Sequence, residues 1–319
     1  MLNTPVAFLI FNRPETTHRV FAEIARARPR RLLIVADGPR SEADADKCRA
    51  ARAVIERVDW QCDILTNYSD INLGCKRRIS SGLSWVFEQC EEAIVLEDDC
   101  LPDPTFFRFC AELLDKYRND QRIMMISGNN FQSDYVRGTS SYYFSCYTHI
   151  WGWASWRRAW QHYDLEMKQW PKLRETGWLR DILDDHTAVK HWLDVLDITY
   201  QGSIDSWDIQ LMFACWVQSG LTVLPNKNLV SNIGFGPNAT HTKSDIYGVA
   251  NLSINEMEFP LEHPEIIESD READIFTFNH LFAKERERPG IYRRLSRRLL
   301  DSLPGAVRES IVGLRAKWG

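Results

Sequence analysis

The first hundred residues alternate between short apolar runs and longer segments with helical periodicity. Residues 6–11 (VAFLIF) are continuously apolar and stop shortly before a proline, and the segment RLLIVADG at 31–38 contains a second such run. Between them, residues 15–28 place apolar side chains at helical spacing. Strands of a parallel sheet are buried on both faces and are therefore apolar throughout, whereas a surface helix is apolar on one side only. The pattern predicts a βαβ unit.

The same alternation continues along the chain. It predicts a helix at 42–57, a strand at 62–67, a helix at 76–89 and a strand at 93–99, then a strand at 123–127 and helices near 178–197 and 208–219. Strands that alternate with helices form a mostly parallel sheet flanked by helices. We therefore expect an α/β fold.

Three consecutive acids, Glu97, Asp98 and Asp99, follow the apolar run at 93–96. Open α/β sheets bind ligands at the carboxyl ends of their strands, and adjacent carboxylates raise one another's pKa unless a cation neutralises them. Mg²⁺ and Mn²⁺ suit such oxygen ligands. Because side chains alternate along a strand, we expect Glu97 and Asp99 to point one way and Asp98 the other. The alternative is a solvated acidic turn.

The segment VLEDDCLPDPTFFRF resembles the metal-binding strand of GT-A nucleotide-diphospho-sugar glycosyltransferases. It is most similar to bacterial family-2-like members and the N-acetylglucosaminyltransferase I group. The resemblance implies a GT-A (Rossmann-like) fold in which Asp99 binds the metal ion. It also implies that Asp98 contacts the ribose and Glu97 the donor sugar.

Other segments extend this resemblance over residues 5–245. FLIFNRPETTHRV, VADGPR and NLGCKRRISSGLSWVF are similar to family segments near the nucleotide. By this match Arg13 lies beside the nucleotide, Asp37 contacts the base, and Lys76 and Arg77 approach the donor. Basic residues at a helix start also suit a diphosphate on electrostatic grounds.

The catalytic base is expected in GSIDSWDIQLMFACW, which has the form of the family segment that carries this residue. An inverting transferase needs a carboxylate to accept the proton of the attacking hydroxyl. The resemblance favours Asp208, with Asp205 in reserve. From the residues alone, Asp208 could equally be a favourable acid in the first turn of a helix that Ser206 or Asp205 caps.

Two further positions complete the predicted site. His241 ends a glycine-containing loop and is a candidate second metal ligand, although a lone histidine is more often an ordinary polar residue. Gly152 and Trp153 lie in the aromatic segment 142–160 and are candidates for the sugar pocket. Tryptophans at helical spacing are more often core residues, which is the alternative for Trp153.

Composition and charge narrow the class of protein. Hydrophobic residues make up 44% of the chain and charged residues 26%, as in an ordinary globular protein. Its eight cysteines form no CxxC pair. The chain has no apolar run of about 20 residues that could span a bilayer and no basic leader, so we expect a cytoplasmic protein.

The charge is distributed unevenly. Residues 288–319 carry eight basic and two acidic side chains, or +6, which leaves −11 for the rest of a chain whose total is −5. Leucines opposite arginines predict a basic amphipathic helix that associates with the inner leaflet of the membrane. The alternative is a helix packed on the acidic body of the same chain. Nucleic-acid binding is disfavoured because the basic residues form no patch elsewhere.

Together these features predict one GT-A domain at 1–285, with a nucleotide-binding half (1–110) and an acceptor and metal half (111–285), followed by a basic helical tail at 286–319. The expected function is inverting, Mn²⁺- or Mg²⁺-dependent transfer of a sugar from a nucleotide-diphosphate donor. The family resemblance suggests a UDP-sugar such as UDP-N-acetylglucosamine, and a glycan, polysaccharide or lipid-linked acceptor. The alternatives are a sugar nucleotidyltransferase, which usually has a glycine-rich loop after the first strand, and a non-catalytic glycan-binding or membrane-associated relative.

Overall fold

The computed structural model describes residues 1–133, 135–235 and 249–283. The chain divides into two compact units, residues 1–277 and residues 278–319. Of the second unit, the described part is the π-helical turn η3 (Phe278–Phe282) and the residue that follows it. The predicted tail at 286–319 lies outside the described residues, and the boundary at residue 285 stays a prediction. No described helix has the length and apolar character needed to cross a membrane.

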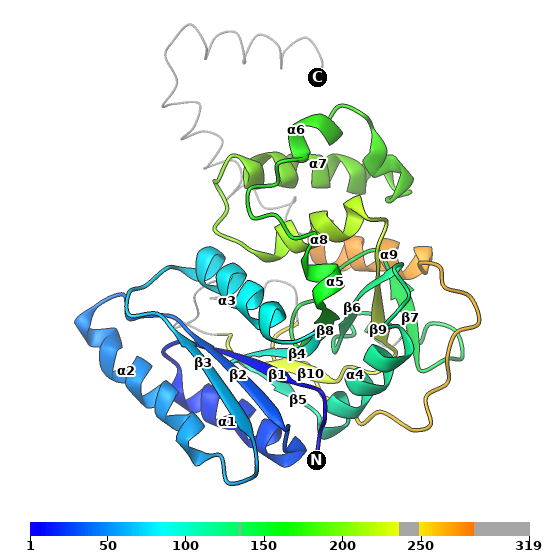
Figure 1. Ribbon diagram of the computed structural model, residues 1–319. Helices are drawn as coiled ribbons and strands as arrows, with labels where there is room; N and C mark the ends of the chain where they lie inside the picture. The colour runs from blue at the N-terminus through cyan, green and yellow to red at the C-terminus, as the bar shows by residue number, and fades with distance from the viewer. Residues whose placement is uncertain (134, 236–248, 284–319) are drawn as a thin grey trace, which may run out of the picture. The chain divides into compact units, whose positions relative to one another are not determined.

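An eight-stranded sheet forms the centre of the first unit (Figure 1). The strand order is β3-β2-β1-β4-β8-β6-β9-β7. The pairs from β3 to β4 and the pair β6/β9 are parallel, whereas β8 and β7 run antiparallel to their neighbours. The mostly parallel α/β architecture is confirmed. The strands are β1 (Val6–Ile10), β2 (Arg31–Ala36), β3 (Asp63–Tyr68), β4 (Glu92–Glu97), β6 (Ile123–Ser127), β7 (Tyr142–Ser145), β8 (Trp153–Trp156) and β9 (Leu221–Pro225).

The remaining elements lie around this sheet. β5 (Cys100–Pro102) and β10 (Val230–Asn232) pair antiparallel in a small second sheet. The helices are α1 (Pro14–Ala27), α2 (Glu42–Ala53), η1 (Val54–Arg57), α3 (Cys75–Gln89), α4 (Pro104–Lys116), α5 (Arg157–Trp160), α6 (Trp170–Leu173), η2 (Trp178–Asp181), α7 (His186–Tyr200), α8 (Asp208–Val217) and α9 (Arg271–Thr277).

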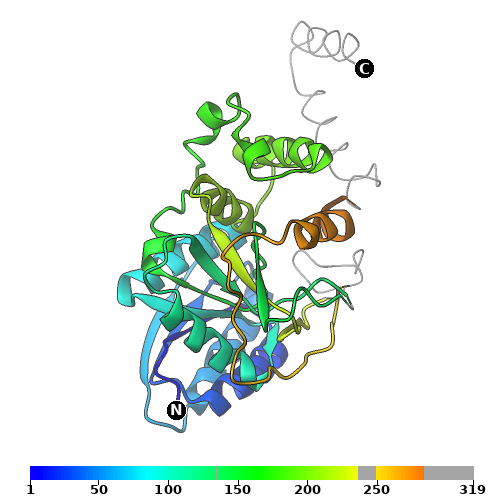
Figure 2. The same ribbon diagram turned by 90° about the vertical axis from the view of Figure 1, so that its right-hand side faces the viewer.

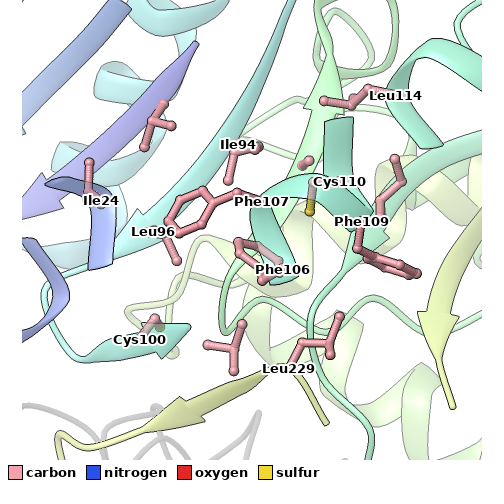
Figure 3. Packing of buried hydrophobic residues seen from close by; sticks show 14 of the residues in the cluster. Ile24, Ile94, Leu96, Cys100, Phe106, Phe107, Phe109, Cys110, Leu114 and Leu229 are labelled. Carbon is pink, nitrogen blue, oxygen red and sulfur yellow. The ribbon is translucent and has the colours of Figure 1, made fainter. Parts of the chain in front are cut away.

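Alternate residues of the central strands face two separate cores. Phe8 and Leu96 belong to the core that α1 and α4 cover, and Leu9 and Val95 belong to the core under α3 and α8. Figure 3 shows the first core, where Ile24 of α1 lies near the side chains of β4 and α4. Since both faces are covered, β1 is apolar throughout and β2 and β4 are apolar apart from their charged end residues, as the sequence pattern predicted.

Two elements are shorter in the structure than the sequence pattern predicted. The strand expected at 93–99 ends at Glu97, and a turn at Asp98 and Asp99 leads into β5. The helix expected at 178–197 is divided into η2 and α7, because the Asp185 side chain accepts a hydrogen bond from Ala188 N (2.7 Å) and starts a new helix.

The chain segment before α9 runs beside β7 at the edge of the sheet (Figures 1 and 2). Ser141 N donates to Glu262 O (2.8 Å) and Asp270 N donates to Phe144 O (2.7 Å). At the end of this segment, Asp274 of α9 accepts hydrogen bonds from the Ser145 hydroxyl and from Cys146 N. Burial nevertheless raises the pKa of Asp274 to about 6. The carboxyl group therefore titrates at a higher pH in the folded chain than in the unfolded chain.

This raised pKa gives a testable dependence of stability on pH. From about pH 4 to about pH 6 the folded chain keeps a proton on Asp274 that the unfolded chain has released, so stability falls as the pH rises. Relative to Asp274→Asn, which does not titrate, the free energy of unfolding of the wild type should fall by up to about 3 kcal/mol across this window. Urea unfolding of both proteins at both ends of the window measures the difference. Parallel pH profiles would contradict the prediction.

Candidate active site

Several of the predicted site residues converge at one edge of the sheet. β1, β2 and β4 are parallel neighbours, so their carboxyl ends meet there. Arg13 follows β1, Asp37 follows β2 and the acidic triplet 97–99 ends β4. The first turn of α3 adds Lys76. Segments far apart in the sequence therefore supply one site.

An ion pair between Arg13 and Asp99 lies at the centre of this site. Arg13 Nη1 is 2.5 Å from Asp99 Oδ2 and 3.7 Å from Asp98 Oδ1. The Arg13 side chain is 26% exposed and that of Asp99 11%. Burial on its own would lower the pKa of Arg13, but the carboxylates of Asp98 and Asp99 outweigh it and raise the pKa. The guanidinium is thus held as a cation against two acids.

The three acids differ in their surroundings. Asp98 accepts a hydrogen bond from Phe11 N (3.0 Å), and burial raises its pKa to about 6 against the attraction of Arg13. Burial and the charges of Asp99 and Asp98 raise the pKa of Glu97 well above its ordinary value. The alternation expected for a strand to residue 99 does not hold. Because β4 ends at Glu97, the turn brings Asp98 and Asp99 to the same guanidinium.

Asp208 approaches the acids from another element. It is the first residue of α8, and the Ser206 hydroxyl donates a hydrogen bond to it. Its charge is close enough to contribute to the raised pKa of Glu97. The pKa of the Cys75 thiol is also raised, first by burial and then by the charges of Glu97, Asp208 and Asp205. The structure therefore gathers Glu97, Asp205 and Asp208 around the start of α3.

Asp37 has a structural role in the described residues. One carboxylate oxygen accepts from Gly38 N and Leu73 N, both at 2.9 Å, and the other accepts from Asn72 Nδ2 (3.0 Å) and Gly74 N (3.1 Å). These bonds hold the loop that precedes α3. The predicted contact with a nucleotide base would have to replace one of them, and it stays a prediction.

Lys76 and Arg77 lie in the first turn of α3. Lys76 is half-buried and Arg77 exposed. Neither side chain forms an ion pair within the described residues. Both cations are therefore available to an anion at this helix start, and their contact with the donor stays a prediction.

Gly152 and Trp153 are buried in the described part of the protein. Trp153 is 1% exposed, because β8 lies between β4 and β6 and its indole packs between Trp160 and Trp207. Gly152 has a φ of +70°, and a Cβ there would lie 2.7 Å from Val230 Cγ2. The sugar-pocket assignment is corrected to a packing role for both residues. For Trp153 this is the core alternative from the sequence.

Three aromatic residues near the site had not been predicted. The Trp151 ring lies 5.2 Å from that of Phe131 and 5.7 Å from that of Phe235, both edge to face, and all three are partly exposed. Trp151 N donates to Asn129 Oδ1 (3.0 Å), which fixes its position. The tryptophan-rich segment was the available signal, but without the strand boundaries it could not show which tryptophan stays near the surface.

Gly234 packs directly on the ion pair. Its neighbour Ile233 donates from the backbone to Asp99 O (2.8 Å), and Gly234 N donates to Asn232 Oδ1 (2.8 Å). A Cβ at Gly234 would lie 2.6 Å from Arg13 Nη1 and 2.7 Å from Asp99 Cβ. Only glycine leaves room for both side chains.

Carboxylate oxygens are suitable ligands for a divalent cation, but the acids of this site are not arranged as a complete metal site. Among the described residues, no three His, Cys, Asp or Glu side chains form a group that could hold a metal ion. Mg²⁺ commonly uses only one or two carboxylates together with water and substrate phosphates, so Asp99 with Asp98 suffices as a protein contribution. Arg13 covers one oxygen of Asp99. His241 lies outside the described residues, and its role as a ligand stays a prediction.

Comparisons with known proteins give distant similarities. No protein-family model and no curated protein sequence matches the chain. A UDP-glucose pyrophosphorylase solved with UDP-glucose is 14% identical over 46% of this chain and 62% of that protein (TM-score 0.25). A 4-diphosphocytidyl-2C-methyl-D-erythritol synthase from Anaerococcus prevotii is 10% identical over 54% and 76% (TM-score 0.27). Mouse xyloside xylosyltransferase 1 in its apo form is 11% identical over 80% and 96% (TM-score 0.35). The function is therefore inferred below from the chain's own residues.

A substitution at Gly234 tests how closely this segment packs on the ion pair. Gly234→Ala forces Arg13 and Asp99 apart, so we expect the free energy of unfolding to fall by roughly 1–3 kcal/mol, the usual cost of overpacking. Chemical denaturation measures this cost. Gly138→Ala is the control, because a Cβ there meets nothing within 4 Å and the cost is limited to backbone strain at φ +64°. Equal costs for the two variants would contradict the packing described here.

Proposed function

We propose that the chain is a glycosyltransferase that moves a sugar from a nucleotide-diphosphate donor, with a UDP-sugar as the expected donor and UDP-N-acetylglucosamine as the first candidate. The acceptor is a glycan, polysaccharide or lipid-linked sugar, and the transfer inverts the anomeric centre. One observation carries the proposal. The acids that end β4 share a sheet edge with the cation Arg13 and with the carboxylate of Asp208, which approaches from α8.

The charges at this edge suit a sugar diphosphate. The phosphates need cations, which Arg13 and the first turn of α3 supply, and hydroxyl groups of a sugar or ribose can donate to Glu97 and Asp98. A divalent cation on Asp99, when bound, would stabilise the diphosphate as it leaves. Mn²⁺ or Mg²⁺ is therefore the cofactor we propose.

Asp208 is the residue proposed to accept the proton. In a single displacement the acceptor oxygen bonds to the anomeric carbon while the bond from that carbon to the diphosphate oxygen breaks. The proton of the acceptor hydroxyl passes to the Asp208 carboxylate. The Ser206 hydroxyl, which donates to Asp208, orients the carboxylate at the start of α8. Asp205, near Gly74, is the reserve candidate.

The products distinguish this reaction from its alternative. A sugar nucleotidyltransferase consumes a sugar phosphate and a nucleoside triphosphate and releases pyrophosphate, whereas a transferase releases the nucleoside diphosphate. The loop after β1 has no glycine, and α1 begins at Pro14 only four residues beyond the end of β1. This short loop favours the transferase. A protein that binds sugar nucleotides without turnover would be a non-catalytic relative.

Asp99→Asn tests donor and metal binding together. A thermal-shift panel of UDP-, GDP- and CDP-sugars, each with and without Mn²⁺, should show stabilisation of the wild type that depends on both nucleotide sugar and metal. Asp99→Asn should lose the metal-dependent part, because a neutral amide is a poorer ligand for a hard cation. Asp59→Asn changes an exposed acid on another part of the chain and is the control. No stabilisation by any sugar nucleotide would remove the support for the proposal.

Asp208→Asn separates binding from turnover. We expect the variant to bind the sugar donor as the wild type does, while release of the nucleoside diphosphate falls by about 10²- to 10⁴-fold, the usual contribution of a general base. Coupled detection of the released nucleotide measures the rate, and isothermal calorimetry measures donor binding. Undiminished release by Asp208→Asn together with a loss in Asp205→Asn would transfer the role of base to Asp205.

A further inference from the structure

The position of Arg13 bears on how the site acquires a metal ion. The guanidinium lies 2.5 Å from Asp99 Oδ2. It therefore already neutralises the carboxylate that a metal ion would bind. A divalent cation on either oxygen of this carboxylate would lie close to the guanidinium, and the two positive charges would repel each other. We infer that Arg13 is the resident counter-cation of Asp99, and that a divalent cation binds Asp99 by displacing the guanidinium.

The surroundings limit which group can move. Asp98 is held by Phe11 N, and Asp99 is held through its backbone carbonyl by Ile233 N. The Asp98 carboxylate and the Asp99 main chain are therefore fixed. The Arg13 side chain is the more exposed partner of the pair, at 26% against 11% for Asp99. The guanidinium is the group with room to leave.

The backbone of Arg13 provides a fixed pivot for this movement. Arg13 caps α1, and its carbonyl accepts hydrogen bonds from Thr17 N (2.9 Å) and the Thr17 hydroxyl (2.7 Å). Pro14 at the first helical position fixes the adjacent backbone torsion. Only the side chain can therefore swing, and its reach keeps the cation at the edge of the sheet.

The displaced guanidinium has a natural second partner. Arginine binds phosphate with two parallel hydrogen bonds, so a guanidinium released from Asp99 can pair with the diphosphate that accompanies the metal ion. This part of the inference rests on the proposed function. The competition between Arg13 and a divalent cation for Asp99 does not, because it involves only the protein and the metal.

Binding of Mn²⁺ alone tests the competition directly. Titration of the protein with Mn²⁺ in the absence of nucleotide, followed by electron paramagnetic resonance of the free ion, gives the dissociation constant. Arg13→Gln removes the competing charge, and we expect it to bind Mn²⁺ at least about tenfold more tightly than the wild type, since a neighbouring cation usually changes the affinity of a carboxylate for a proton by this factor or more. Arg13→Gln should also gain a larger thermal stabilisation from Mn²⁺.

Three further variants make the outcome decisive. Arg13→Lys keeps the positive charge and should retain the weak Mn²⁺ binding of the wild type. Arg13→Gln combined with Asp99→Asn should lose the gain, because the ligand is removed. Arg19→Gln changes an exposed arginine on the same helix and should bind Mn²⁺ as the wild type does.

The results separate this inference from the proposed function. Unchanged or weaker Mn²⁺ binding in Arg13→Gln would overturn the inference, as would a gain that survives in the double variant or appears equally in Arg13→Lys. Tighter Mn²⁺ binding in Arg13→Gln, in a protein that no sugar nucleotide stabilises, would support the counter-cation role and reject the proposed transferase activity.

Discussion

The attraction between the acids that end β4 and the single guanidinium of Arg13 is the interaction on which the rest of this site depends. Three carboxylates lie next to one another and are largely shielded from water, an arrangement that costs free energy unless cations or protons offset it. Burial raises the pKa of Glu97 and Asp98, as this cost predicts. Arg13 offsets part of the cost through its ion pair with Asp99. The site remains receptive to further positive charge.

The topology of the sheet gives the two sides of this edge different chemistry. Glu97 follows Val95 by two residues and so faces the side covered by α3 and α8, where Asp208 lies. The turn after Glu97 directs Asp98 and Asp99 to the cation at the start of α1. Carboxylates that could handle hydroxyl protons are therefore gathered on one side, and the cation that could meet phosphates lies on the other. A sugar diphosphate has the same polarity along its length.

The sequence predicted those parts of the structure that depend on local pattern. Strands buried on both faces need continuous apolar runs, so β1, β2 and β4 could be read directly, and the acids could be placed at the sheet edge because the run 93–96 leads straight into them. The contact between Arg13 and Asp99 joins residues 86 positions apart and depends on the parallel pairing of β1 and β4. No local pattern specifies it.

Long-range packing also explains the errors. Trp153 was a reasonable sugar platform as an isolated tryptophan, but its strand is inserted between β4 and β6, and this insertion buries it. The tryptophan of this segment that stays partly exposed near the site is Trp151, which precedes the strand. The sequence pattern also did not predict that β4 ends at Glu97. The turn there leads into β5, which pairs with β10 more than 120 residues later.

Gly234 links the pairing of β5 with β10 to the ion pair between Arg13 and Asp99. The chain leaves β10 and crosses Asp99 within two residues, so the strand pair that ends β4 at Glu97 also brings a backbone segment onto the ion pair. A side chain at Gly234 would separate the charges. Without a side chain there, the guanidinium stays against the carboxylate and shielded from water, which strengthens the attraction and limits the positions that a competing cation can take. The pairing of β5 with β10 thereby contributes to the close contact between Arg13 and Asp99.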